Sequence, residues 1–340
     1  MQVTETTFPN KFLIMPTIDY FFGDVRNGEN FLDIVATFSF KDIAEIYVTR
    51  SGGIAFTFLD KGPLQSITKY QTRGSGMVPD HARQNHDEIV DLQGRRLIFA
   101  NFIAATLFGK LSAIRNCSLR SAQYAGMDEI VACTPSGSEL VVEHSKHSNE
   151  LFSPKVHLVR QKPKHMQIIS PDDLEKAIDF VAHVSTREDE FQYADMQACM
   201  VMNYQAAILH NEQHAAASLA LNFSVAEALI EEIFLAYGIV GDQTPKAFAK
   251  VKHTVPQVSK RQFSKWGLGQ KISTLSDGNL IDHYLCQRID EARKVRNHLM
   301  HRAVSVNVIQ SGNMQTVVRD LWSLLIDEPF ELITGYSMRM

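Results

Sequence analysis

The sequence has few cysteines, no large excess of charge of either sign and no long hydrophobic run. Its four cysteines lie far apart and form no C-x-x-C pair, which argues against a zinc ribbon and a dense disulfide framework. A net charge of −4 at pH 7 argues against a general nucleic-acid coat or a polybasic membrane binder, although a local basic patch remains compatible with it.

The hydrophobic runs are too short to cross a membrane. The longest, from Leu97 to Phe108, has about a dozen residues and is interrupted by Asn101, whereas a span needs about twenty. The N-terminal residues lack the basic segment and apolar core of a secretory signal. We therefore expect a reduced, cytoplasmic protein with no membrane partner.

The bulk composition is that of a globular chain with more than one domain. The 340 residues are 45% hydrophobic and 21% charged, which is enough apolar material for a full core, and the length fits two domains of about 150 residues each. The polar, proline-containing segment 161–165 marks a change of periodicity. We predict an α+β fold, with a mixed, β-rich α/β domain at 1–165 and an all-α domain at 170–340.

The two halves differ in the spacing of their apolar residues. In the first half, Ser51-Gly52-Gly53 reads as a hairpin turn, and helical spacing at 97–114 predicts one helix among strands at 31–40, 44–49, 54–58, 129–133, 140–143 and 156–159. In the second half, Ser170 and Pro171 begin a helical series. We predict helices at 171–184, 190–214, 217–238, 258–275, 280–302 and 313–328.

The helix predicted at 280–302 carries the main functional signal. Position 296 falls in its core-facing apolar stripe, and an arginine occupies it. The apolar members of the stripe are Leu285, Ile289, Ala292, Leu299 and Ala303. A guanidinium stays charged and is costly to bury unpaired, so Arg296 needs an acid or an anion such as phosphate. Either partner suits the planar fork of an arginine.

Asn297 and His301 are four residues apart and so share one face of this helix. With Arg296 they provide a cation, a positioning amide and a group that titrates near neutral pH, which suits phosphodiester chemistry without a metal or other cofactor. The same residue types also cap helices and pair with buried acids. Spacing alone leaves both the catalytic and the structural interpretation open.

Residues 291–301 resemble the R-N-x-x-x-H signature of HEPN domains, with Arg296, Asn297 and His301 in the motif positions. The apolar helix 223–234 with its embedded acid, and the segment 271–275 before a turn, are also similar to that family, so the resemblance covers roughly residues 190 to 335. It implies a helical bundle that forms a homodimer around a shared, metal-independent ribonuclease site.

The resemblance also implies a role for each motif residue. Arg296 would bind the scissile phosphate, Asn297 would position it, and His301 would act as general acid or base or orient the RNA. Attack by the ribose 2′-OH would leave a cyclic phosphate, so RNA would be cut and DNA would not. Many toxin-type members carry a tyrosine just after the histidine, whereas Arg302 and Ala303 follow here.

Two functions are in competition, and a third, in which the N-terminal half is an enzyme of its own, has no nucleophile elbow, paired-acid motif or phosphate loop to support it. In the first, the protein is an endoribonuclease with an antiviral-defence or toxin role, restrained by an N-terminal domain that binds a trigger or inhibitor. In the second, it is a non-catalytic HEPN-like module that dimerises and binds RNA or protein. Glu227 is expected to support Arg296 as a buried counter-charge rather than to act in catalysis. In the first function Arg296 and His301 line an open, phosphate-sized cleft between protomers, and in the second acids such as Glu227 hold them closed to solvent.

Several weaker signals are interpreted as structural. His210 and His214 have the i, i+4 spacing of zinc ligands but fit a solvated helix face better, and His144 and His147 read as an exposed loop. The glycine-containing segments 73–76 and 136–138 match no phosphate-binding loop. The basic and aromatic residues at 260–266 favour an amphipathic helix with Trp266 in the core over a nucleic-acid surface.

Overall fold

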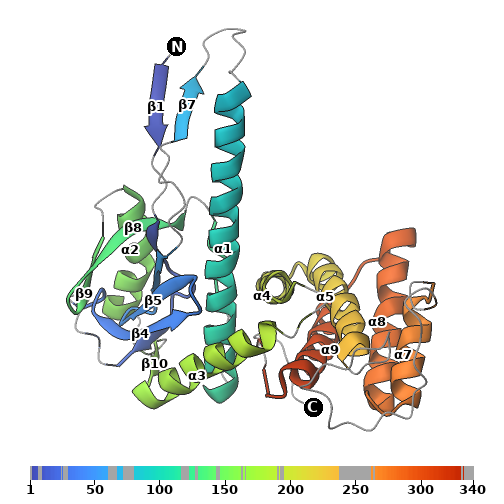
Figure 1. Ribbon diagram of the computed structural model, residues 1–340. Helices are drawn as coiled ribbons and strands as arrows, with labels where there is room; N and C mark the ends of the chain where they lie inside the picture. The colour runs from blue at the N-terminus through green and yellow to red at the C-terminus, as the bar shows by residue number, and fades with distance from the viewer. Residues whose placement is uncertain are drawn as a thin grey trace. The chain divides into compact units, whose positions relative to one another are not determined.

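The fold is α+β, with the strands in the N-terminal half and a series of helices after them, which confirms the predicted class (Figure 1). The computed structural model describes residues 2–6, 10–23, 25, 30–59, 67–71, 80–115, 122–126, 129–142, 146–161, 164, 166–189, 191, 195–236, 262, 265–330 and 332.

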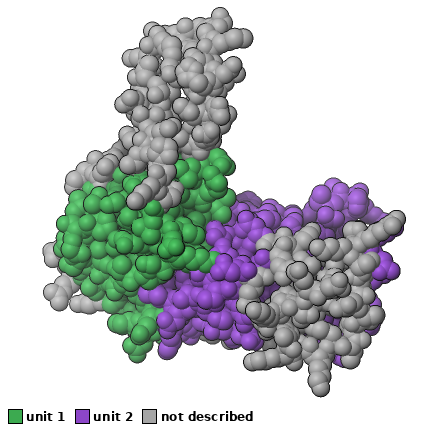
Figure 2. Space-filling model, viewed as in Figure 1, with its two compact units in different colours: residues 1–104, 121–175 green, residues 105–120, 176–340 purple. Residues whose placement is uncertain are grey.

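The chain forms two compact units, coloured separately in Figure 2. Unit 1 contains residues 1–104 and 121–175, and unit 2 contains residues 105–120 and 176–340. The predicted boundary at 165–170 lies close to the change of unit after residue 175. The sequence predicts two domains that are each continuous in the chain. In the structure, residues 105–120 from the first half belong to the helical unit instead.

Unit 1 is built on an antiparallel sheet of six strands in the order β4-β5-β6-β2-β8-β9. The strands are β2 (Lys11–Ile14), β4 (Ile34–Phe40), β5 (Ala44–Thr49), β6 (Ile54–Phe58), β8 (Val131–Ser136) and β9 (Glu139–Val142). The two ends of this order meet: the Ile34 amide donates to Ser138 O over 2.8 Å, and the Leu140 amide donates to Leu32 O over 3.0 Å. The sheet therefore curls back on itself.

Alternation along these strands gives the sheet two apolar faces. Phe12 and Phe56 on one face join an aromatic cluster that includes Phe99 of α1 (Asp80–Arg115). Leu13 and Ala55, the neighbours of those strand residues, belong to a second cluster against which Phe152 of α2 (Lys146–Gln161) packs. A helix thus covers each face.

Two small sheets complete unit 1. β1 (Gln2–Thr6) pairs antiparallel with β7 (Ile67–Gln71), and β3 (Tyr20–Phe22) pairs parallel with β10 (Gln167–Ile169). Lys155 of α2 is fully buried beside β3 and donates to the carbonyls of Ile18 and Tyr20, each over 3.2 Å. Burial lowers the pKa of Lys155 to about 7, although Asp19 opposes the shift.

Helix α1 is long and apolar enough in residues Asp91–Arg115 to cross a membrane by length and composition alone. However, 78% of its apolar window is buried inside the protein, as in the core helix of a soluble protein. Its position in the core follows from Phe99 and Phe102, which contact the sheet through Phe40 at ring-centroid distances of 5.2 and 5.7 Å.

Unit 2 is a group of packed helices together with the end of α1. They are α3 (Pro171–Glu188, whose first residues count in unit 1), α4 (Met196–Asn211), α5 (Ala215–Ala236), α7 (Leu268–Asp277), α8 (His283–Arg302) and α9 (Val308–Ile326). Trp322 of α9 is completely buried and stacks on Phe191 with ring centroids 6.2 Å apart. Phe330 packs on Phe180 at 5.7 Å and closes this core.

Candidate functional site

The site predicted from sequence lies at the C-terminal end of α8. Asp282 caps the start of the helix, where its side chain accepts from the Leu285 amide over 2.6 Å. Leu285, Ile289 and Ala292 are buried, as the apolar stripe predicts, whereas Leu299 is half-buried and Ala303, beyond the last turn, is exposed. The helix ends at Ala303, whose left-handed backbone (φ 51°, ψ 34°) lets its amide reach Leu299 O over 3.1 Å.

Arg296 continues the buried stripe and is half-buried. Its guanidinium carbon lies 5.4 Å from the ring centroid of Phe223 in α5, and its Nη1 donates to Asn297 Oδ1 over 3.3 Å. Within the described part of the chain, Arg296 forms no ion pair with a carboxylate. The side chain is therefore held by an aromatic ring and a neutral amide.

Neighbouring cations of α8 are held differently. Arg288 pairs with Asp320 of α9 over 2.8 Å. Arg293 and Lys294 share Asp290, at 2.6 and 2.9 Å. Their hydrogen bonds, first that of Lys294 and then that of Arg293, keep the pKa of the Asp290 carboxyl below its usual value. Arg296 thus differs from these three residues in keeping its charge unneutralised by a described carboxylate.

Glu227 lies one helical turn after Phe223 on α5 and is half-buried. Burial raises the pKa of its carboxyl, the charge of Arg296 opposes this, and Glu231 reinforces it. Glu231 is itself paired with Lys271 of α7. Glu227 therefore acts on Arg296 through longer-range attraction, without the direct ion pair expected from the sequence.

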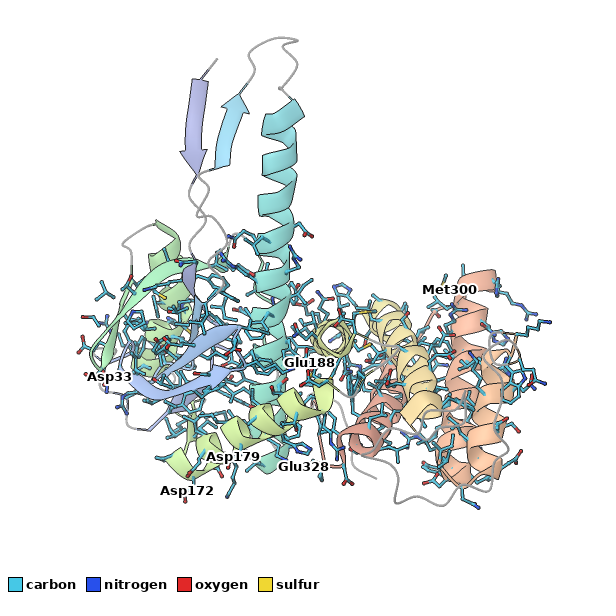
Figure 3. The ribbon with its side chains drawn as sticks, in the orientation of Figure 1. Asp33, Asp172, Asp179, Glu188, Met300 and Glu328 are labelled. Carbon is cyan, nitrogen blue, oxygen red and sulfur yellow. The ribbon has the colours of Figure 1, made fainter. Side chains whose placement is uncertain are left out.

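Asn297 and His301 lie on the adjoining face of α8, and His301 is exposed. An ideal helix places His301 about 140° around the axis from Arg296, so the two side chains point to different sides of α8. The hydrogen bond from Arg296 Nη1 to Asn297 Oδ1 links Arg296, on the buried side, to the side that carries Asn297 and His301. Met300 is 59% exposed at the end of α8 (Figure 3), and Val304 and Ile309 are 48% and 70% exposed nearby in the chain. Cationic and apolar groups thus share this end of the helix.

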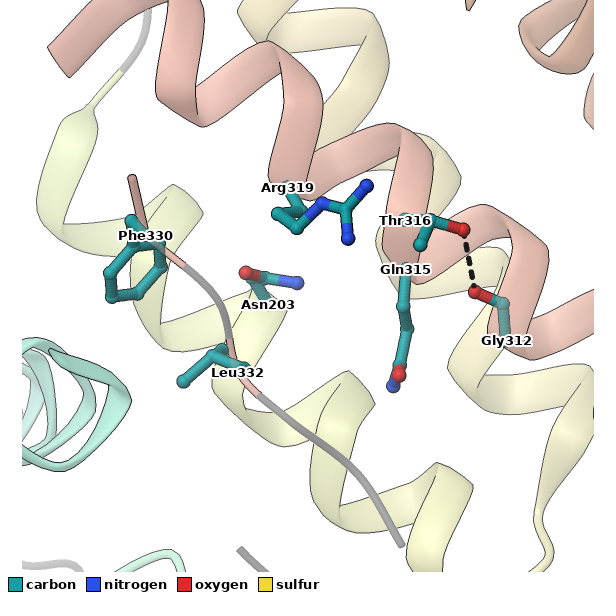
Figure 4. Close-up of a pocket in the computed structure, with 7 residues that line it drawn as sticks. All are labelled: Asn203, Gly312, Gln315, Thr316, Arg319, Phe330 and Leu332. Atoms are coloured by element: carbon teal, nitrogen blue, oxygen red, sulfur yellow. Dashed lines mark hydrogen bonds between the residues drawn. The ribbon is translucent and has the colours of Figure 1, made fainter. Parts of the chain in front are cut away.

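A small pocket between α4, α9 and the segment after α9 is a separate feature of unit 2 (Figure 4). Its volume of about 20 Å³ holds roughly one water molecule. A nucleotide does not fit in it. The lining residues are Asn203, Gly312, Gln315, Thr316, Arg319, Phe330 and Leu332.

The histidine pairs do not have the geometry assumed from their spacing. α4 ends at Asn211, so His210 and His214 do not share one helix. The predicted solvated face is wrong for His210, which is 1% exposed and bonded through Nδ1 to Ser311 Oγ over 3.1 Å. Among the residues that the structure describes, no group of three or more His, Cys, Asp or Glu side chains is arranged to hold a metal ion.

The remaining minor predictions have mixed outcomes. His147 belongs to α2 rather than to a loop, whereas His144 lies outside the described residues. Gly137 forms the turn between β8 and β9 with φ 62°, as expected for a structural glycine, and segment 73–76 is not described. Trp266 is half-buried against Phe234 at 6.3 Å, just before α7 begins, and residues 260, 261 and 263 fall outside the described part.

Sequence reasoning missed Phe223 as part of the site. The residue appeared only as an apolar position of its helix, because nothing in its spacing indicates which cation will lie over its ring. Comparison of the chain with protein-family models, with curated proteins and with solved structures finds no significant match. The HEPN resemblance therefore stays a prediction that rests on residues 291–301 and the flanking pattern.

Proposed function

We propose that unit 2 is a metal-independent endoribonuclease of the HEPN type, with Arg296, Asn297 and His301 as its site. One observation carries the proposal: Arg296 is a half-buried cation with no carboxylate ion pair among the described residues, bonded to Asn297 and one and a half helical turns from an exposed His301. A bound phosphate would supply the missing counter-charge.

The proposed reaction is attack of a ribose 2′-OH on the adjacent phosphodiester. The 2′ oxygen forms a bond to phosphorus while the bond from phosphorus to the 5′ oxygen breaks, which yields a 2′,3′-cyclic phosphate and a 5′-OH. Arg296 stabilises the charge that builds on the phosphoryl oxygens. His301 takes the proton from the 2′-OH or gives one to the leaving oxygen, and Asn297 positions the phosphate.

A homodimer would bring two such helix ends together. Met300, Val304 and Ile309 support this part of the proposal, because they are exposed apolar side chains within ten residues of one another, at the end of α8 and the start of α9. We further propose that the protein works in the cytoplasm in antiviral defence or as a toxin, with the N-terminal region binding the trigger or inhibitor.

The direct test is RNA cleavage in EDTA by the full-length protein. We expect wild type to cut a mixed RNA pool to cyclic-phosphate ends and to leave DNA of the same sequence intact. His301→Ala should lower the rate at least about 100-fold if its ring transfers a proton. His298→Ala, on the same helix and also exposed, is the matched control and should retain activity.

Arginine variants complete the test. Arg296→Gln should abolish cleavage, whereas Arg293→Gln, which removes a cation already paired with Asp290, should have little effect. Equal losses in the motif variants and their controls would contradict the assigned roles. RNA binding without cleavage by the wild-type protein would favour the non-catalytic module.

A further inference from the structure

The side of α5 that faces Arg296 carries an aromatic residue followed by two acids at regular spacing. Phe223, Glu227 and Glu231 follow one another at intervals of four residues, so they lie along one side of the helix. Lys271 pairs with Glu231 at one end of this row, and Arg296 lies over the ring of Phe223 at the other. The row thus offers two cations different partners: an acid for Lys271 and an aromatic ring for Arg296.

The ring is well suited to hold a cation in one place. Phe223 is 2% exposed, so the surrounding core fixes its orientation. A guanidinium at 5.4 Å from the centroid is attracted by the negative face of the ring. A guanidinium carries five N–H donors, and its contact with an aromatic ring pairs none of them with a carboxylate.

An aromatic partner also differs from an acid in its charge. Asp320 and Asp290 pair directly with Arg288 and Arg293 and offset part of their charge, although each aspartate also pairs with a second cation. A carboxylate already bonded to the guanidinium makes either arginine a poorer ligand for a phosphate. Phe223 holds Arg296 without neutralising it. The amide of Asn297 takes one donor through Oδ1 and leaves the others for an incoming anion.

We infer that Phe223 is a positioning residue, whose ring presents the charged Arg296 guanidinium to the phosphodiester of an RNA strand. The positioning role of Phe223 rests on the proposed function, which makes the scissile phosphate, or the one next to it, the anion bound by Arg296. Glu227 is too far for a direct ion pair and contributes attraction along the same row.

The test compares Phe223→Leu with Phe223→Trp in the full-length protein. Loss of the ring should lower kcat/KM for RNA about 3- to 30-fold, the range of a partly desolvated cation–π contact. The tryptophan variant should restore most of that loss. Phe234→Leu is the matched control, since Phe234 is a buried phenylalanine of the same helix that contacts Trp266 instead.

A second readout does not depend on cleavage. The Arg296 Nε–H signal in the NMR spectrum of the RNA-free protein should be sharp in wild type and in Phe223→Trp, and broadened in Phe223→Leu, with Phe234→Leu unchanged. Titration with a 2′-O-methyl RNA, which cannot be cut, should shift this signal less in Phe223→Leu.

The outcomes separate the two ideas. Absence of cleavage by wild type would count against the proposed function, while the NMR comparison would still decide whether Phe223 orders Arg296. Cleavage by wild type that falls no further in Phe223→Leu than in Phe234→Leu, with the same Arg296 signal in both, would overturn the positioning role.

Discussion

At the scale of single residues, Arg296 occupies a place where an apolar side chain would be the stable choice. It continues the buried stripe of α8, yet it forms no ion pair with a described carboxylate. Among the described residues, the Phe223 ring, the Asn297 amide and the longer-range attraction of Glu227 offset the free energy of desolvating part of the guanidinium. A residue that lowers stability in this way is expected where function requires it.

Replacing Arg296 by methionine should therefore stabilise unit 2 while it abolishes cleavage. The expected gain is about 1 kcal/mol in the free energy of unfolding, because an apolar chain removes the desolvation cost. Urea titration followed by tryptophan fluorescence measures it, since both tryptophans of the chain, Trp266 and Trp322, lie in unit 2.

Arg293→Met is the control for this measurement. Arg293 is about one-third exposed and paired with Asp290, so its loss should change stability by less than about 0.5 kcal/mol. If Arg296→Met proves less stable than wild type by 1 kcal/mol or more, Arg296 serves the fold, and the argument for an anion at this position loses its main support.

At the scale of elements, Gly109 lets α1 pack closely against the segment that follows α9. A Cβ at Gly109 would lie 2.6 Å from Phe330 Cε2 and 2.9 Å from Leu332 Cδ2, distances that real Cβ contacts essentially never show. Phe330 is buried against Phe180 and Trp322 and so has little room to move. The glycine is therefore required for the close approach of this part of α1.

Gly109→Ala should destabilise unit 2 by about 1 to 2 kcal/mol, because overpacking outweighs the better helix propensity of alanine. Gly94→Ala is a control on the same helix, since no atom lies within 4 Å of its added Cβ. It should leave the tryptophan-monitored midpoint unchanged or slightly raised. A Gly109→Ala protein as stable as Gly94→Ala would mean that the C-terminal segment does not pack on α1.

The elements also differ in how well the sequence predicts them. β5 and β6 are predicted to the residue, because a β-prone run on each side of Ser51-Gly52-Gly53 matches a paired hairpin. The prediction of a strand at 156–159 is wrong, because these residues belong to α2. α2 contains Pro154, which is unusual inside a helix, and the run Val156-His157-Leu158-Val159 that follows it is β-prone when taken alone.

Some features of the site follow from the sequence of one helix, and others depend on contacts between helices. The position of Arg296 in the core stripe and the common face of Asn297 and His301 follow from the period of one helix, and the sequence predicts both. The ring of Phe223 and the pairing of Glu231 with Lys271 depend on how α5, α7 and α8 pack. No local pattern encodes such contacts between helices, so they are found only in the structure.

At the scale of the whole molecule, one helix contributes to both compact units. Residues 80–104 of α1 belong to unit 1, and residues from 105 onward belong to unit 2. Within unit 2, Lys110 pairs with Glu328 over 2.8 Å and lies 4.5 Å from the ring centroid of Phe180. A division of the protein at residue 165 would therefore remove part of the core of the helical unit.

We accordingly expect a fragment of residues 166–340 to be less stable than the full chain. Loss of α1 uncovers part of Phe180 and Phe330, which corresponds to at most about 3 kcal/mol of apolar burial and lowers the melting temperature by up to about 10 °C. A fragment of residues 105–340 keeps these contacts and should melt close to the full chain, as followed by Trp322 fluorescence. Equal melting of both fragments would contradict this role of α1.

The same pair of fragments tests whether unit 1 restrains the proposed ribonuclease. If cleavage by residues 105–340 exceeds that of the full chain, the restraint lies in residues 1–104, because the fragment also retains 121–175. Equal activity of residues 105–340 and the full chain would mean that residues 1–104 do not restrain cleavage. Inactivity of residues 166–340 alone has a simpler cause, since the Phe223–Arg296 contact requires a folded unit 2. Regulation is therefore measured with the fragment that retains the end of α1.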